Sequence, residues 1–261
     1  MRGGRSVGCV IATPLVRIRH GDTVEISGAY QHQARNSGPA VQRFWHQEKE
    51  RIICKFSPPK PGQRVLDVGC GSGVVADFLA SMGAEVTGVD ANAKAIAFAR
   101  DTFHRPNLDF RCAFVEDLAF AAASIDRVYC LEVIEHLYAQ QVSALLAAFA
   151  RLLRPGGVLT LTTPNYHGLW PAIEFVMDRL RLAPAMAEQQ HVTRFDRARL
   201  RQVLADADWE IVRLATFSTF APFVSFLSWR LAQRCAEIED RADLSLGNLL
   251  LLVARRRGCD G

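Results

Sequence analysis

A glycine-rich turn follows a short apolar segment of the sequence. Residues 65–68 run directly into Gly69–Gly73 (GCGSG) and then into a helical segment. Glycines let a backbone turn sharply, approach a ligand closely and direct N–H groups at it. A dinucleotide site would have the spacing G-x-G-x-x-G, but Val74 stands where its third glycine belongs. Asp67, two residues before the first glycine, would repel a pyrophosphate and attract an α-amino group, which favours an adenosyl amino acid over NAD.

A second carboxylate ends the next apolar segment. Asp90 closes the run Thr87–Asp90, downstream of the glycine turn. A carboxylate at this place can accept two hydrogen bonds from ribose hydroxyls. Asp90 could instead cap the helix expected from Ala91 onward. The glycine turn upstream favours the ribose interpretation.

A cluster of acids and histidines lies further along the chain. Glu132, Glu135 and His136 are spaced i, i+3 and i+4, so they would share one face if the segment is helical. His136 and His191 are the best candidates for a general base, because imidazoles exchange protons near neutral pH. His167, after a predicted strand, is a third candidate.

The elements that must position these residues alternate regularly. From residue 64 onward, short β-branched runs alternate with helical segments, which indicates a parallel sheet with crossover helices. A further helix is expected over residues 39–56, opened by Pro39. The predicted strands are 64–68, 85–89, 108–111, 127–130, 158–163, 209–216 and 248–254, and the predicted helices are 74–82, 91–103, 139–153 and 196–206.

Composition bounds the class of protein. The 261 residues are 49% apolar and 22% charged, enough for a large core, and basic residues (31) barely exceed acidic ones (27). This balance disfavours a nucleic-acid protein. The seven cysteines form no CxxC pair, which fits a reducing cytoplasm better than a disulfide framework.

The chain is expected to be one domain with a leader. Residues 1–28 are interpreted as a flexible leader and residues 29–261 as the domain, with a cap helix region at 29–60. The leader is arginine-rich and acid-poor, as transit peptides are, but it lacks a clear cleavage site. We expect a cytoplasmic protein, peripheral to the membrane at most.

Together the motifs resemble class I S-adenosylmethionine-dependent methyltransferases. The likeness is strongest to the ubiquinone-biosynthesis O-methyltransferases and weaker to small-RNA 2′-O-methyltransferases. It implies an α/β, Rossmann-like, seven-stranded sheet in the order 3-2-1-4-5-7-6, with the last strand antiparallel and helices on both faces. The segments that carry it, in the family's order and spacing, are Val65–Gly73, Thr87–Asp90, Phe114–Asp117, Leu131–His136 and Leu153–Gly157.

The resemblance implies S-adenosylmethionine as the cofactor. Its methionine part would lie against Asp67 and the glycine turn, with the carbonyl of Leu131 meeting its ammonium group. Asp90 would bind the ribose, and the backbone of Val115 the adenine. Arg43 could reach the methionine carboxylate, although its spacing from the helix start departs from the ubiquinone type and an exposed arginine fits equally. The candidate cofactor residues are Arg43, Asp67, Gly69, Cys70, Gly71, Asp90, Ala91, Val115, Glu116 and Leu131.

The resemblance leaves two roles open for the acid–histidine cluster. Some relatives use E-x-x-E-H with a later histidine to hold a divalent metal, and His191 stands near the place of that histidine. Such a set suits Mg²⁺, Mn²⁺ or Zn²⁺, which would lower the pKa of an acceptor hydroxyl. Many relatives carry the same motif without metal, and a metal-free role is the default expectation. The candidate metal ligands are Glu132, Glu135, His136 and His191.

The acceptor side of the chain is the least patterned. Residues 217–246 are expected to form an apolar helical insertion between the last two strands, either buried on the sheet or making a weak membrane-surface contact through residues 217–231. The expected reaction is O-methylation of a small, largely apolar hydroxylated acceptor, such as a quinone, lipid or natural product. The alternatives are an RNA 2′-O-methyltransferase, a catalytically silent cofactor-binding subunit and a nicotinamide oxidoreductase.

Overall fold

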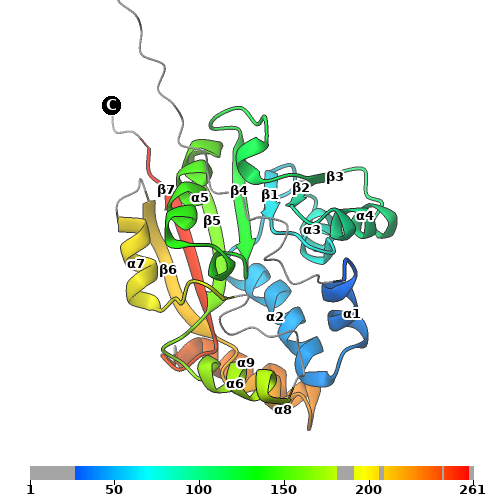
Figure 1. Cartoon of the computed structure of the whole chain (residues 1–261), viewed down its shortest axis with the longest axis vertical. Helices are drawn as coiled ribbons and strands as arrows, with labels where there is room; N and C mark the ends of the chain where they lie inside the picture. Colours follow the sequence, from blue (N-terminus) through cyan, green and yellow to red (C-terminus); the bar gives the residue numbers. More distant parts are fainter. Residues whose placement is uncertain (1–26, 181–190, 206–208, 243, 259–261) are drawn as a thin grey trace, which may run out of the picture.

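The computed structural model describes residues 27–180, 191–205, 209–242 and 244–258. Its centre is a seven-stranded sheet in the order β3-β2-β1-β4-β5-β7-β6 (Figure 1). β7 is antiparallel to both neighbours and the other pairs are parallel, which confirms the expected fold. The strands are β1 (Arg64–Val68), β2 (Glu85–Asp90), β3 (Leu108–Cys112), β4 (Ile125–Leu131), β5 (Leu153–Pro164), β6 (Trp209–Phe217) and β7 (Leu249–Arg256).

The helices lie on the two faces of the sheet and at one of its ends. In Figure 1, α1, α2, α6, α8 and α9 gather below the sheet, and α3 and α4 lie beside β1 to β3. The helices are α1 (Tyr30–Ser37), α2 (Ala40–Phe56), α3 (Val74–Ser81), α4 (Ala93–Thr102), α5 (Ala139–Leu152), α6 (Trp170–Leu180), α7 (Arg197–Ala205), α8 (Ala221–Val224) and α9 (Trp229–Ala242), with short 3₁₀ helices η1 (Val115–Asp117) and η2 (Ile134–His136).

Helices cover both faces of the sheet. Because successive residues of a strand point to opposite faces, neighbouring residues pack in different clusters. In β1, Val65 packs in a cluster with residues of α3 and α4, such as Ile96. Its neighbour Leu66 packs in a second cluster that includes Phe149 of α5. Burial on both sides explains why β1 reads as an apolar run rather than as an alternating one.

The predicted boundaries hold to within about two residues, except at one strand. β5 was expected from residue 158, but it begins at Leu153, which pairs with Ile125 across a register irregularity in β4. Almost all of the predicted leader lies outside the described residues. The cysteines 54, 70, 112, 130 and 235 are free thiols. Each helix of the described part is too short or too polar to span a membrane.

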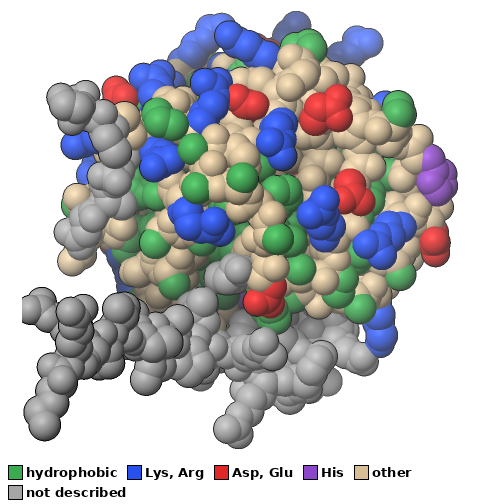
Figure 2. Space-filling model, turned by 90° about the horizontal axis from the view of Figure 1, so that it is seen from above, with side chains coloured by type: hydrophobic (Ala, Val, Ile, Leu, Met, Phe, Trp, Pro, Cys, Tyr) green, Lys and Arg blue, Asp and Glu red, His purple; other side chains and the backbone are tan. Residues whose placement is uncertain are grey.

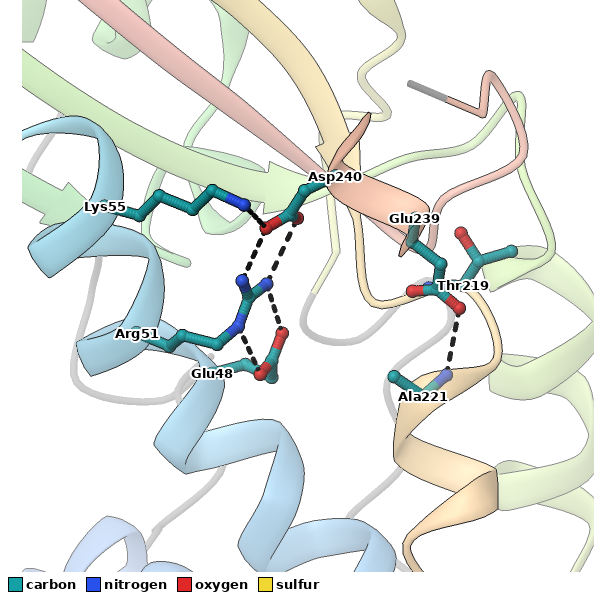
Figure 3. Close-up of polar contacts among 7 residues, drawn as sticks. All are labelled: Glu48, Arg51, Lys55, Thr219, Ala221, Glu239 and Asp240. Atoms are coloured by element: carbon teal, nitrogen blue, oxygen red, sulfur yellow. Dashed lines mark hydrogen bonds and ion pairs between the residues drawn. The ribbon is translucent and has the colours of Figure 1, made fainter. Parts of the chain in front are cut away.

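A partly buried ion cluster holds helix α2 against α9 (Figure 3). Arg51 of α2 contacts both carboxylate oxygens of Asp240, at 2.5 and 3.1 Å, and also binds Glu48 at 2.7 and 2.8 Å. Lys55 Nζ reaches Asp240 at 2.7 Å. Next to Asp240, Glu239 accepts hydrogen bonds from the backbone N–H groups of Thr219, Phe220 and Ala221. The cluster fixes the insertion to the N-terminal helices.

The insertion between β6 and β7 is two helices rather than one. The single turn α8 is separated from α9 by residues 225–228. The buried face of α9 carries small residues, Ala232 and Ala236, which pack against Phe44 of α2. Trp229 at the start of α9 also packs on this cluster, whereas Phe226 and Leu227, in the segment between the two helices, are 79% and 80% exposed.

Candidate active site

The glycine turn after β1 has a backbone that only glycine adopts readily. Gly69, Gly71 and Gly73 have φ of 72°, 49° and 83°. A Cβ on Gly69 would lie 2.3 Å from a methyl group of Val133, so the turn is also sterically closed to larger residues. The result is a loop whose N–H groups are presented at the carboxyl ends of β1 and β2.

Asp90 belongs to this turn. Its Oδ2 accepts a hydrogen bond from Gly71 N at 2.9 Å, and its Oδ1 accepts one from Asn92 N at 2.7 Å. Asn92, and not Asp90, caps helix α4, by accepting from the N–H groups of Lys94 and Ala95. Asp90 therefore contacts the glycine turn and does not cap α4.

Asp67 is a buried carboxylate with an unused oxygen. The residue is 2% exposed, and its Oδ2 has no hydrogen-bond partner among the described residues. Burial and the neighbouring Asp90 raise the pKa of Asp67 to about 7, although Lys49 acts in the opposite direction. Leaving such an oxygen unpaired is costly. It is placed to accept a hydrogen bond from a cationic donor in the adjacent cavity.

That cavity is small because α1 covers it. Its volume is about 30 Å³, close to one water molecule. Gln31 of α1 reaches the glycine turn and accepts a hydrogen bond from Ser72 N at 2.7 Å, while His32 N donates to Ser72 Oγ at 3.0 Å. The lining residues are Gln31, His46, Lys49, Asp67, Gly69, Cys70, Val74, Val75 and Leu131.

Two cavity residues were not anticipated from the sequence. Lys49 of α2 is 7% exposed, and its Nζ lies 3.0 Å from Glu132 Oε2. Burial and Lys49 lower the pKa of His46 to about 4, so this imidazole is neutral near pH 7. Neither His46 nor Lys49 is among the candidate site residues of the sequence. The i, i+3 spacing of the pair on one helix face was the available signal.

Glu132 follows β4 in a left-handed backbone conformation, with φ of 58°. Burial favours a raised pKa for Glu132, but Lys49 and His46 outweigh it and lower the pKa. Its Oε1 has no partner among the described residues. Because η2 begins only at Ile134, Glu132 lies outside the helical face that the spacing suggested. It turns towards α2 instead.

Glu135 and His136, both in η2, come together with His191. One potential ligand atom from each lies within 4.8 Å of the others, and the two imidazole centroids are 5.1 Å apart. Glu135 is 1% exposed, and burial raises its pKa to about 7 although Thr163 Oγ1 donates to it at 3.0 Å. Such a cluster could hold a divalent ion or a proton.

Backbone hydrogen bonds hold in place the segment that carries His191. The N–H groups of Val192 and Thr193 donate to the carbonyl of Glu135 at 2.9 and 3.0 Å. Thr193 Oγ1 also donates to the carbonyl of Leu137 at 2.6 Å. These bonds explain why a histidine so distant in sequence lies beside η2.

The remaining candidates are spread more widely. The Arg43 guanidinium lies 5.4 Å from the ring centroid of Trp229 and does not line the cavity, so its role stays a prediction. Val115 and Glu116 lie in η1, and Val115 is buried in the core. The carbonyl of Ala91 accepts a weak hydrogen bond from Cys112 Sγ. His167 is exposed, and none of the described contacts joins it to the other histidines.

Comparison with known proteins agrees with this geometry. A family model described as a methyltransferase domain matches residues 30–214. A ubiquinone biosynthesis O-methyltransferase of Paracidovorax citrulli is 37% identical over 142 residues, 48% of this chain and 58% of the relative. The corresponding protein of Xanthomonas campestris is 42% identical over 108 residues, 40% of this chain and 44% of the relative. The chain thus spans about half the length of the curated relatives it matches.

A solved structure shows the same fold. The S-adenosylmethionine-dependent methyltransferase from Mesorhizobium loti superposes with a TM-score of 0.58 over 84% of this chain and 99% of its own, at 21% identity. At this identity the match supports the fold alone. Together with the family match, it confirms the resemblance and the enzyme class that the sequence motifs indicated.

Proposed function

We propose, on the premise that the chain belongs to the family of methyltransferase domains, that it methylates a hydroxyl oxygen of a small acceptor with S-adenosylmethionine. One observation carries the proposal: β1 and β2 bring two carboxylates to the glycine turn, where Asp67 lines the cavity beside Gly69 and Asp90 accepts a hydrogen bond from Gly71 N. The curated relatives, which are named O-methyltransferases, support the oxygen as the acceptor atom.

The polar groups around the cavity suit the charged groups of the cofactor, and the cavity, about 30 Å³ with Gln31 in place, would have to open to admit it. The unpaired oxygen of Asp67 suits its ammonium group, and Lys49 is a buried cation for its carboxylate. Asp90 suits the ribose hydroxyls. When bound, S-adenosylmethionine supplies a methyl group on a positively charged sulfur, ready for in-line attack by a nucleophile. The protein mainly has to position the two partners and exclude water.

His191 is the best-placed general base for the acceptor hydroxyl. Burial and the neighbouring His136 lower the pKa of His191, so near neutral pH it is uncharged and can take a proton. An open hollow beside it, lined by Tyr138, Val192, Arg194 and Arg199, offers a place for a small acceptor. In a second proposed role, Glu135, His136 and His191 would hold a divalent ion such as Mg²⁺ or Mn²⁺, which would lower the pKa of the same hydroxyl.

Calorimetric titration with S-adenosylhomocysteine tests the cofactor site. We expect micromolar binding by the wild type and its loss in Asp90→Ala, with Asp109→Ala, an exposed acid on β3, as the matched control. Equal binding by all three proteins, or no binding by the wild type, would remove the premise of the site. Transfer of a labelled methyl group to amines or carbon but to no hydroxylated acceptor would contradict the O-assignment.

An RNA acceptor is disfavoured by the distribution of charge. On the described part of the face shown in Figure 2, basic and acidic side chains are interspersed and no basic stripe forms. Phosphate-tracking proteins concentrate lysine and arginine. Salt-sensitive RNA retention in a filter-binding assay would revive this alternative. Cofactor binding without turnover on any acceptor would favour the silent-subunit alternative.

An anionic lipid surface is the proposed contact of residues 217–231. Phe226, Leu227 and Leu231 are 79%, 80% and 54% exposed, and the exposed Arg230 and Arg234 flank them on α9. Apolar side chains beside arginines suit an interface rich in anionic lipid. The surface would bring a lipid-like acceptor to the enzyme.

Vesicle flotation tests this contact. We expect weak binding to vesicles containing phosphatidylglycerol, little binding to pure phosphatidylcholine, and a several-fold loss in the double variant Phe226→Ser, Leu227→Ser. Ile238→Ser, at an apolar site beyond residue 231 that is 64% exposed, is the control. Equal binding by both variants would contradict the assignment of the surface.

A further inference from the structure

A buried glutamate that no sequence motif includes contacts the candidate base. Glu174 of α6 is 4% exposed and His191 is 7% exposed. Glu174 Oε1 lies 2.8 Å from His191 Nδ1 and 2.9 Å from the Tyr166 hydroxyl. The Tyr166 hydroxyl also lies 2.9 Å from His191 Nδ1. The three polar groups thus meet at one point behind the imidazole.

The direction of these hydrogen bonds follows from the chemistry of the groups. An ionised carboxylate only accepts hydrogen bonds. Glu174 Oε1 therefore accepts one hydrogen bond from the Tyr166 hydroxyl and one from His191 Nδ1–H. With its proton on Nδ1, a neutral imidazole carries its lone pair on Nε2. This is the nitrogen left to take an acceptor proton or bind a metal ion.

We propose that Glu174 is a positioning residue that holds His191 as the Nδ1–H tautomer, with Nε2 available for the reaction. This inference rests on the proposed function, because it assigns a purpose to Nε2. It applies equally to a base and to a metal ligand, since both need the Nε2 lone pair. A carboxylate behind a histidine commonly fixes tautomer and ring orientation.

The fold does not need Glu174 to place His191. The backbone bonds from residues 192 and 193 to Glu135 hold the segment, and the ring of Trp170 packs 5.9 Å from the imidazole. What Glu174 adds is a negative acceptor on one particular ring nitrogen. Its loss should therefore change the imidazole more than the surrounding structure.

The test combines a spectrum with kinetics. In protein labelled with ¹⁵N-histidine, long-range ¹H–¹⁵N spectra distinguish the two tautomers, and comparison with His191→Asn assigns the signals. We expect Nδ1–H in the wild type and a shift towards Nε2–H in Glu174→Gln, whose amide can donate to Nδ1. We expect kcat to fall about 10²-fold or more, with the KM for S-adenosylmethionine unchanged. Glu174→Asp should restore part of both.

Tyr166→Phe is the matched control. It removes one hydrogen bond from the same carboxylate but keeps the Glu174–His191 pair, so the tautomer should persist and kcat should fall only a few-fold. An Nε2–H tautomer in the wild type, or a loss of kcat in Glu174→Gln without a change of tautomer at unchanged melting temperature, would overturn the proposal. Because the spectrum needs no turnover, failure of methyl transfer in every protein would count against the proposed function alone.

Discussion

The two carboxylates of the Glu132–His136 segment, one before η2 and one within it, have opposite environments. Glu132 is partly buried against Lys49, and its pKa is lowered, whereas Glu135 is fully buried three residues later, and its pKa is raised to about 7. The chain turns between them, so that Glu132 contacts Lys49 of α2 and Glu135 faces the histidines. The E-x-x-E-H motif therefore spans two environments: an ion pair beside the glycine-turn cavity, and a buried carboxyl group next to two imidazoles.

The largest expected effect is a contrast in pH dependence. Because the folded pKa of Glu135 is about 7 against an ordinary 4.5, the unfolded chain releases this proton first, and its contribution to stability falls as pH rises between those values. The side chain that replaces Glu135 in the variant Glu135→Gln is neutral at every pH. Between pH 4.5 and 7 the free energy of unfolding of the variant should therefore rise relative to that of the wild type, by up to about 3 kcal/mol. Urea unfolding from pH 4 to 8 measures the difference.

Glu132→Gln is the matched variant for that experiment, and its curve should have the opposite sign. The pKa of Glu132 is lowered, so the wild type gains stability over the variant as pH rises towards 4.5 and loses it as pH falls through the folded pKa. Parallel curves for the two variants would mean that their environments do not differ.

Removing Lys49 should make the surroundings of Glu132 resemble those of Glu135. Lys49→Met leaves Glu132 without its cation, and we expect a loss of about 2 kcal/mol, below the ~3–5 kcal/mol typical of a fully buried pair. The double variant Lys49→Met, Glu132→Gln should recover most of this loss. Chemical denaturation near pH 7 compares the three proteins, and no recovery in the double variant would show that Lys49 stabilises the fold by packing alone.

Metal uptake should discriminate the two carboxylates further. Any Mn²⁺ bound by the chelator-treated protein should depend on Glu135 and His191, and Glu135→Gln should weaken binding at least about tenfold. Glu132→Gln should leave the affinity nearly unchanged, because Glu132 lies outside the three-residue group. Electron paramagnetic resonance counts free Mn²⁺, and an equal loss in both variants would join Glu132 to the ligands.

The smallest effect concerns the cover of the cavity. Gln31 accepts the Ser72 N–H bond above the glycine turn, so Gln31→Ala should tighten S-adenosylhomocysteine binding by a few-fold, the scale of one net hydrogen bond. Gln42→Ala, which removes a contact with Tyr30 away from the turn, is the control. Weaker binding in Gln31→Ala would instead make Gln31 part of the cofactor site.

The sequence predicted those parts of the molecule that local chemistry determines. The resemblance carried by the motifs implied the strand order, which the structure confirms. Asp67 and Asp90 lie beside the glycine turn, as their places after β1 and at the end of β2 indicated, whereas their roles towards a cofactor stay predictions and Asn92 is the helix cap. In each case the deciding residues are neighbours along the chain.

What the sequence missed depends on contacts between distant segments. Lys49 and Glu174 lie on helices outside the motifs, and their partners are 83 and 17 residues away. No local pattern tells which lysine of an amphipathic helix will point inward. Likewise, the split of residues 217–246 into α8 and α9 depends on Glu239 binding the α8 backbone.

Helix α2 has 17 residues, and two of its faces contact different parts of the molecule. His46 and Lys49 line the cavity beside the glycine turn from one of them, and Arg51 and Lys55 hold α9, with its exposed apolar surface, from the other. A ligand that shifts the helix at either face must disturb the contacts at the other. Thermodynamic linkage makes such an effect reciprocal: docking of α9 on a surface and occupancy of the cavity would change one another's affinity by the same factor.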